Sequence, residues 1–217
     1  MRTWAILVCL LLASAGSAVA ASSSPGKYLI IYRRSDQSTI LGAGTFTVRS
    51  TGDIDGLGYL WSGHNGMYIK GHAVSGATIT LRVKIFIEKT VHLLTGKTAF
   101  LSTGFHTKVN RTHTQFVGFP LTSAHPYAGA YVGLVRNEYL YLIVFNTDKI
   151  FGQQHRGAEL HVVGGTLSGR RWVAGIQGRP YYLSGFVLKD SRGLYLLGQV
   201  VDKQSGDVLE QFKARQI

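Results

Sequence analysis

The segment from Ala77 to Glu88 reads ATITLRVKIFIE and alternates strictly between aliphatic and mostly polar residues. Successive side chains of a β-strand point to opposite faces of the sheet, so this pattern predicts a strand with one dry and one wet side. The dry side carries Ile79, Leu81, Val83, Ile85 and Ile87. Such a strand is longer than the usual length of about five to six residues, as in a barrel or a strongly coiled sheet.

The rest of the chain reads as short β-rich runs separated by glycines, which number 27 against only 4 prolines. No sustained helical period interrupts these runs, which excludes a fold of alternating strands and helices. We therefore predict a single all-β domain, an antiparallel meander of about ten strands that forms a barrel or a sandwich.

The chain begins MRTWAILVCLLLASAGSAVAA, with a basic residue, an apolar run and a small-residue cleavage pattern. We interpret residues 1–20 as a signal peptide and residues 21–217 as the domain, in a secreted or periplasmic protein. The only cysteine, Cys9, lies in the signal peptide, so the mature chain is expected to be cysteine-free. No later apolar run is long enough for a membrane-spanning helix. An outer-membrane barrel is a less favoured alternative because the chain ends in Ile217 rather than in an aromatic residue.

The segment at about 99–129 differs from its surroundings because it contains three histidines and two prolines and little alternation. We predict a long loop or crossing here, between two halves of the domain. A sequence echo supports two halves: residues 66–74 and 193–201 share the pattern Gly-apolar-Tyr-apolar-x-Gly-x-apolar-Val.

The chain is strongly basic, with 23 Lys and Arg residues against 11 Asp and Glu residues. Such a surface attracts polyanions, which for an exported protein means acidic polysaccharide, lipopolysaccharide or an anionic surface. Export makes nucleic acid an unlikely partner. The alternative interpretation is that the charge serves only solubility.

The first candidate site is a predicted hairpin around Asn65-Gly66, a dipeptide that favours a two-residue turn. That turn would place Trp61 opposite Lys70 and Tyr59 opposite His72. The outward face would then be aromatic and cationic, and suited to stack sugar rings or hold an anion. Its members are Tyr59, Trp61, Tyr68, Lys70 and His72. A purely structural cross-strand ladder is the alternative.

The second candidate site is GRRWVAGIQGRPYY, residues 169–182, which combines guanidinium groups with aromatic rings. Arginine binds carboxylate, sulfate and phosphate groups with two parallel hydrogen bonds. We predict ligand-binding roles for Arg170, Arg171, Trp172 and Arg179. On one strand, Arg170 and Trp172 would point away from Arg171, so they would not all serve one site. Solvated charge on an edge strand is the alternative.

Signatures of enzymes and metal sites are missing from the sequence. The pair Asp53 and Asp55 resembles the start of a calcium loop but lacks the remaining ligands, and the eight histidines have no ligand spacing. We expect no metal and no cofactor, and favour a non-catalytic protein that binds an acidic polymer or glycan. The alternative is a β-barrel that encloses a small apolar ligand or carries an enzyme active site in its pocket. Its cavity would be lined by Tyr59, Trp61 and Tyr68.

Overall fold

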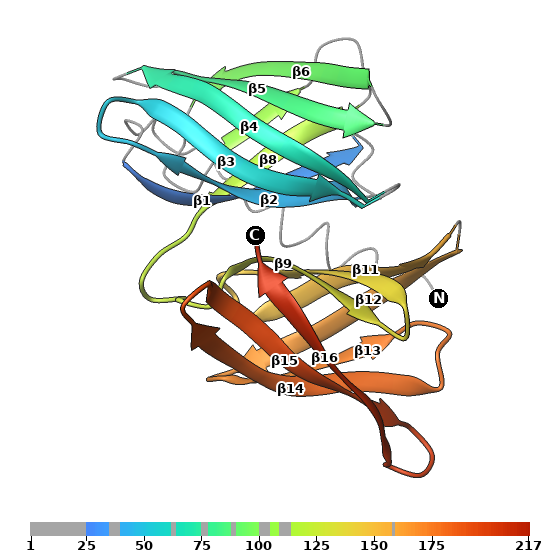
Figure 1. The fold of residues 1–217 in the computed structure, drawn as a ribbon. Helices are drawn as coiled ribbons and strands as arrows, with labels where there is room; N and C mark the ends of the chain where they lie inside the picture. Colours follow the sequence, from blue (N-terminus) through green and yellow to red (C-terminus); the bar gives the residue numbers. More distant parts are fainter. Residues whose placement is uncertain are drawn as a thin grey trace. The chain divides into compact units, whose positions relative to one another are not determined.

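The computed structural model describes residues 25–34, 40–61, 64–74, 78–87, 90–99, 105–108, 114–157 and 159–217, and gives the strands between residues 73 and 114 by their backbone. This part of the chain forms sixteen β-strands and contains no α-helix (Figure 1). The strands belong to two compact units, residues 1–120 and 121–217. Each unit is described below by itself.

The N-terminal unit is an antiparallel sheet of eight strands in the order β6-β5-β4-β3-β2-β1-β8-β7. Its strands are β1 (Gly26–Arg34), β2 (Ile40–Val48), β3 (Asp53–Leu60), β4 (Asn65–Val74), β5 (Thr78–Ile87), β6 (Thr90–Ala99), β7 (Phe105–Lys108) and β8 (Thr114–Pro120). Alternate side chains of β1 to β4 and β8 form the described core, in which Tyr28 stacks on Phe46 with ring centroids 5.3 Å apart. The long alternating run at 77–88 is β5, as predicted.

The C-terminal unit is a closed barrel of eight antiparallel strands joined mainly by short turns (Figure 1). Its strands are β9 (Gly129–Val135), β10 (Glu138–Val144), β11 (Lys149–Arg156), β12 (Glu159–Ser168), β13 (Arg171–Ile176), β14 (Tyr181–Asp190), β15 (Gly193–Asp202) and β16 (Val208–Gln216). Each strand pairs with its successor, and β16 closes the barrel by pairing with β9, where Ala214 lies opposite Gly133. The predicted all-β antiparallel meander is therefore confirmed, and of the two predicted forms, a barrel or a sandwich, this unit is a barrel.

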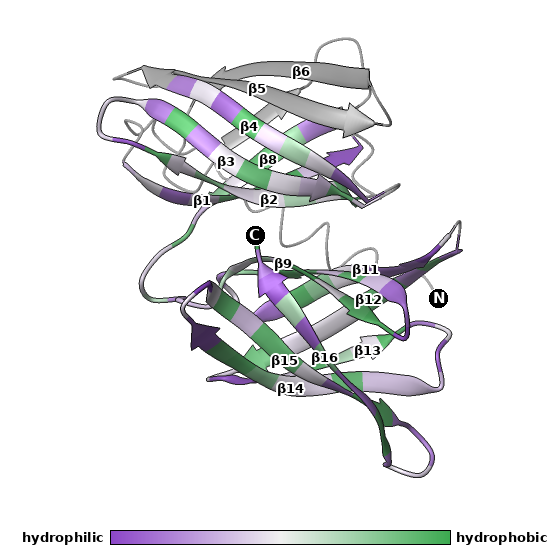
Figure 2. Ribbon diagram, in the orientation of Figure 1, coloured by the Kyte–Doolittle hydropathy of each residue, from purple (hydrophilic) through white to green (hydrophobic). Residues whose placement is uncertain are grey.

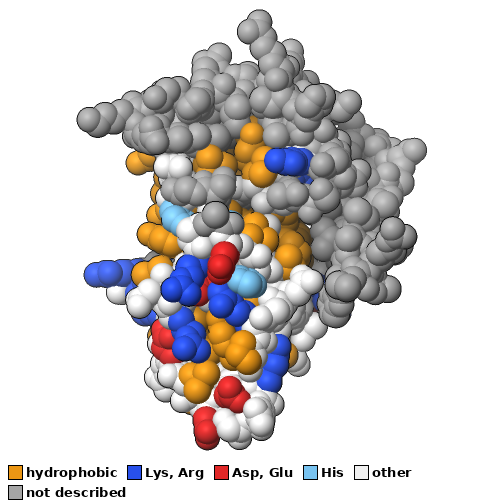
Figure 3. All heavy atoms as spheres, turned by 90° about the vertical axis from the view of Figure 1, so that its right-hand side faces the viewer, with side chains coloured by type: hydrophobic (Ala, Val, Ile, Leu, Met, Phe, Trp, Pro, Cys, Tyr) orange, Lys and Arg blue, Asp and Glu red, His pale blue; other side chains and the backbone are white. Residues whose placement is uncertain are grey.

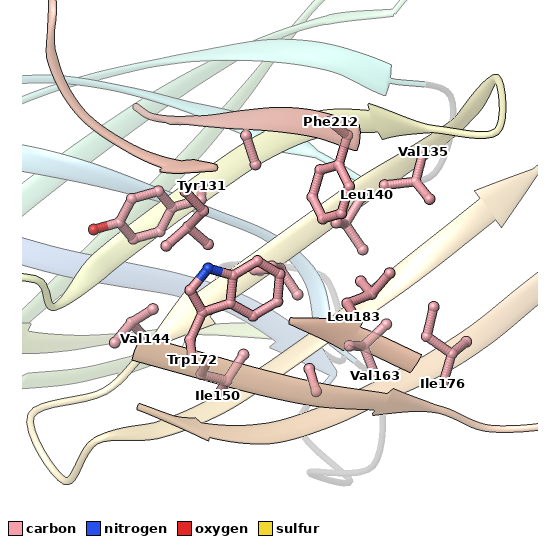
Figure 4. Packing of buried hydrophobic residues seen from close by; sticks show 14 of the residues in the cluster. Tyr131, Val135, Leu140, Val144, Ile150, Val163, Trp172, Ile176, Leu183 and Phe212 are labelled. Carbon is pink, nitrogen blue, oxygen red and sulfur yellow. The ribbon is translucent and has the colours of Figure 1, made fainter. Parts of the chain in front are cut away.

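Large side chains fill the barrel interior (Figure 4). The ring of Trp172 meets that of Phe212 edge-on, with centroids 6.0 Å apart and an interplanar angle of 73°. The register places Trp172, Gly185, Gly198 and Phe212 in one inward-facing row across β13 to β16. A Cβ atom at Gly198 would meet the ring of Phe212, and one at Gly185 would meet the backbone of Leu197. Gly198 thus provides the space that the ring of Phe212 occupies, and Gly185 allows its strand to lie close to the backbone of β15.

The structure differs from the sequence prediction in the number of strands and in the segment 99–129. The strands β6, β7, β8 and β11 were not predicted, because their sequences mix Gly, Gln, His and Thr with few alternating apolar residues. β7 and β8 lie inside the segment predicted as a long loop, and the boundary between the two units also falls there, after Pro120. The sequence echo occupies β4 and β15, the fourth strand of one unit and the seventh of the other, so it does not mark equivalent positions.

The predicted signal peptide, residues 1–20, lies outside the described residues, as do parts of the segment 99–129. Within the described part of the chain, no helix has the length and apolar character needed to cross a membrane.

Candidate binding faces

The hairpin of β3 and β4 does not use the predicted turn. Tyr59 pairs with Gly66 and Asp53 with His72, so Asn65 and Gly66 belong to β4 and the connection runs through residues 61–64. In this connection His64 has a positive φ value of 56°. The register is therefore shifted by six residues from the predicted one. Because six is an even number, side chains keep the faces predicted for them.

The outward side of this hairpin, which we call the N-terminal hairpin face, carries four of the five predicted residues and two aspartates. Its members are Asp53, Asp55, Leu57, Tyr59, Tyr68, Lys70 and His72. Asp55 pairs with Lys70 in the register and lies 3.8 Å from the guanidinium of Arg49. Asp53 lies 3.3 Å from His72 Nδ1. Lys70 and His72 of β4 thus lie opposite carboxylates of β3, which weakens the predicted attraction for anions.

Asp53 is held in its ionised form by its neighbours. A hydrogen bond from Thr51 Oγ1, 2.8 Å long, and the contact with His72 lower the pKa of this carboxyl. Asp53 and Asp55, the pair that resembles a calcium loop, therefore interact with side chains of the hairpin. No group of three or more metal-ligating side chains occurs among the residues that the structure describes.

Trp61 does not belong to the N-terminal hairpin face. It begins the connection between β3 and β4, its backbone N–H donates to the carbonyl of Leu41, and only 2% of its surface is exposed. Burial removes Trp61 from the predicted binding face and from the predicted pairing with Lys70. Tyr68, in contrast, points outward and is 48% exposed. The enclosed cavity that Tyr59, Trp61 and Tyr68 were predicted to line is therefore not formed by these residues.

The second predicted site is divided between the two ends and the interior of the barrel. Trp172 is only 1% exposed and lies in the core (Figure 4). Arg170 lies in the turn before β13, and its Nε donates to the hydroxyl of Tyr127 over 3.2 Å. Arg171 points outward on β13. Arg179 lies in the turn after β13, at the other end of the barrel. The motif therefore provides one outward arginine on the sheet rather than a cluster.

Arg179 is used structurally at its end of the barrel. Its Nη2 donates to both oxygens of Glu138, over 2.9 and 2.8 Å, and the side chain of Glu138 is only 7% exposed. Nearby, Tyr181 donates to Gln154, and the guanidinium of Arg136 lies over the ring of Tyr181. Figure 3 shows basic and acidic side chains side by side on the barrel, in the lower part of this view. Arg179 and Glu138 thus neutralise each other at this end of the barrel.

A different outward surface emerges from the register of β13 to β16. Arg171 lies opposite Phe186, Phe186 opposite Leu197, and Leu197 opposite Lys213. We call these four residues the basic row. Phe186 is 53% and Leu197 40% exposed, and their neighbours in sequence alternate between core and surface (Figure 2). Exposed apolar side chains flanked by polar groups are typical of interaction sites.

A charged cluster lies beside the basic row, toward the turn between β14 and β15. It consists of Asp190, Tyr195, Lys213 and Arg215, and we call it the Asp190 cluster. Lys213 Nζ lies 3.0 Å from Asp190 Oδ2 and 3.5 Å from the centroid of the Tyr195 ring. Arg215 donates to both carboxylate oxygens of Asp190 over 3.2 and 2.8 Å. The hydrogen bonds from Arg215 and then Lys213 hold the pKa of Asp190 well below its usual range.

Sequence reasoning identified Arg171 but missed Phe186, Leu197, Tyr195, Lys213 and Arg215. Each of these residues lies on a different strand from Arg171, and the row exists only when four strands are aligned in register. One signal was available in the sequence after Val208. Apolar and basic residues alternate there, which predicts that Phe212 and Ala214 lie on one face of a strand and Lys213 and Arg215 on the other.

No family model matches this sequence, and no curated protein or solved structure resembles it. The residues and their geometry are therefore the basis for assigning a function.

Proposed function

We propose that the protein is an exported, non-catalytic binding protein that engages an acidic polymer through the outer face of β13 to β16. The observation that carries this proposal is the basic row, in which Arg171 and Lys213 flank two exposed apolar side chains. The strong positive charge of the chain, +12 in total, draws a polyanion toward it. Acidic polysaccharide, lipopolysaccharide and an anionic surface all present such charge outside the cytoplasm.

The surroundings of Arg171 support a binding role. Among the described residues Arg171 takes part in no ion pair, whereas Arg179, Arg215 and Lys213 all contact carboxylates, so a ligand would share Lys213 with Asp190. A guanidinium without a partner keeps all its donors for a sulfate, phosphate or carboxylate group of a ligand. The barrel interior, in contrast, is filled by side chains such as Trp172 and Phe212, which favours binding on the outside over an enclosed ligand.

The test compares dextran sulfate with uncharged dextran, two polymers with the same backbone, over a series of salt concentrations. We expect saturable binding to dextran sulfate that weakens with salt, and no binding to dextran. The double variant Arg171→Ala/Lys213→Ala should reduce this binding. The double variant Arg49→Ala/Lys70→Ala removes the same charge from the N-terminal unit and serves as the control. Absence of binding at low salt, or an equal loss in both variants, would overturn the proposal.

A further inference from the structure

The arrangement of the basic row also indicates what kind of acidic polymer it fits. We infer that the ligand is an acidic polysaccharide whose chain runs across β13 to β16, with its sugar rings on Phe186 and Leu197 and its acidic groups at Arg171 and Lys213. This inference rests on the proposed function and adds the chemistry and direction of the ligand. It follows from the order cation, apolar, apolar, cation along one row of paired residues, in which Arg171 has no ion pair among the described residues and Lys213 is shared with Asp190.

The centre of the basic row requires a ligand with an apolar surface between its charges. Phe186 and Leu197 are 53% and 40% exposed, and they face each other across two paired strands. A sugar ring has an apolar face of C–H groups, and it can cover these side chains while its acidic substituents project to either side. Burying the apolar pair is favourable and does not depend on salt. A bare chain of anionic groups would leave both side chains in water.

The length of the basic row requires a ligand longer than one sugar. Arg171 and Lys213 are separated by three strand spacings, a distance of about 14 Å along the sheet at about 4.8 Å for each spacing. One acidic monosaccharide cannot contact both cations at this separation. An oligosaccharide that crosses the strands contacts both, and each contact then raises the effective concentration for the other.

The aromatic side chains of this face argue against single-stranded nucleic acid. Proteins that bind single strands stack successive bases on a series of aromatic rings. On this face the ring of Phe186 is exposed, but the next aromatic residue, Tyr195, has Lys213 Nζ 3.5 Å from its ring centroid. The Tyr195 ring is therefore already covered by a cation. One open ring beside an aliphatic side chain suits a sugar better than a run of bases.

The test measures affinity for dextran sulfate, inorganic polyphosphate, a sulfated monosaccharide and single-stranded DNA at several salt concentrations. We expect dextran sulfate to bind at least about tenfold more tightly than polyphosphate of equal charge, a difference of about 1.4 kcal/mol. The sulfated monosaccharide should not compete at equal sulfate concentration. Tighter binding of DNA than of dextran sulfate would overturn the inference in favour of nucleic acid.

Variants separate the apolar contacts from the charges. The double variant Phe186→Ala/Leu197→Ala should weaken dextran sulfate binding at least about fivefold, leave polyphosphate binding unchanged and leave the salt dependence unchanged. The control, Leu134→Ala/Leu160→Ala, removes equally exposed leucines from other strands and should change neither. All four positions are exposed, so thermal unfolding should confirm that the variants fold. If both polymers bind equally and the apolar variant has no effect, the inference fails while the proposed function stands. If neither polymer binds, both fail.

Discussion

Two outward surfaces of the protein combine aromatic and cationic side chains on antiparallel strands, yet they differ in what lies opposite the cations. On the N-terminal hairpin face, Lys70 and His72 pair in register with Asp55 and Asp53. On the basic row, Arg171 and Lys213 pair in register with Phe186 and Leu197, and Lys213 also contacts Asp190, which lies outside the row. We therefore expect the affinity of a strand for anions to depend on the neighbouring strand as well as on its own residues.

The largest effect is expected for a residue that the sequence assigned to a binding face and the structure assigns to the core. Trp172→Ala should lower the free energy of unfolding by about 3–5 kcal/mol, because it leaves a large cavity beside Phe212. Urea unfolding measures this loss. Trp172→Phe should cost much less, since Trp172 Nε1 has no hydrogen-bond partner among the described residues. If the Trp172→Ala variant has normal stability but no longer binds dextran sulfate, Trp172 belongs to the binding face and not to the core.

The second effect concerns the two faces directly. Arg171→Ala/Lys213→Ala should weaken dextran sulfate binding by more than about tenfold and reduce the salt dependence, because two ligand contacts are lost. Arg49→Ala/Lys70→Ala should weaken it by less than about threefold. Isothermal titration at several salt concentrations gives both quantities. The reverse ranking of the two variants would place the binding site on the N-terminal hairpin face.

A smaller effect should follow when the carboxylates of the N-terminal hairpin face are removed. Asp53→Asn/Asp55→Asn leaves Lys70 and Arg49 without their acidic neighbours. The variant should bind dextran sulfate about two- to fivefold more tightly than the wild type, the effect of exposed ion pairs being modest. The same titration measures the gain. A variant with unchanged affinity would show that these aspartates do not limit anion binding.

The smallest effect is the contribution of Asp190 to acid stability. The pKa of Asp190 is lower in the folded protein than its ordinary value of 3.8, chiefly through Arg215, so the unfolded chain binds a proton more readily. The stabilisation is therefore complete above that ordinary value and is lost as the pH falls toward the folded pKa. Asp190→Asn should flatten the fall of the melting temperature below about pH 4. Asp53 and Asp202, whose pKa values are also lowered, should keep some acid sensitivity. Identical pH profiles would contradict the role of Asp190.

The sequence predicted the fold class and the sidedness of the strands, because both depend on the local alternation of apolar residues. It did not predict register. Asn65-Gly66 is a strong turn signal, but a different turn allows Trp61 to be buried, and this burial outweighs the local preference. Trp172 was placed on the surface because the residues that share its inward-facing row, Gly185, Gly198 and Phe212, lie on other strands.

The candidate site depends on long-range alignment even more strongly. Arg171 and Lys213 are separated by two intervening strands. The residues next to each of them in the sequence do not indicate that it flanks a pair of apolar side chains. Such a row becomes visible only when the pairing of each strand is known.

The pairing of β16 with β9 has a consequence for how the protein is made. Every other contact between neighbouring strands of the barrel joins segments that follow each other in synthesis, so the sheet can grow hairpin by hairpin. The ring can close only after β16 has emerged. Until then, β9 and the last strand formed present open hydrogen-bonding edges that invite pairing with other chains. Because β16 also supplies Lys213, the surface that we propose for binding is completed in the same step that removes the open edges of the barrel.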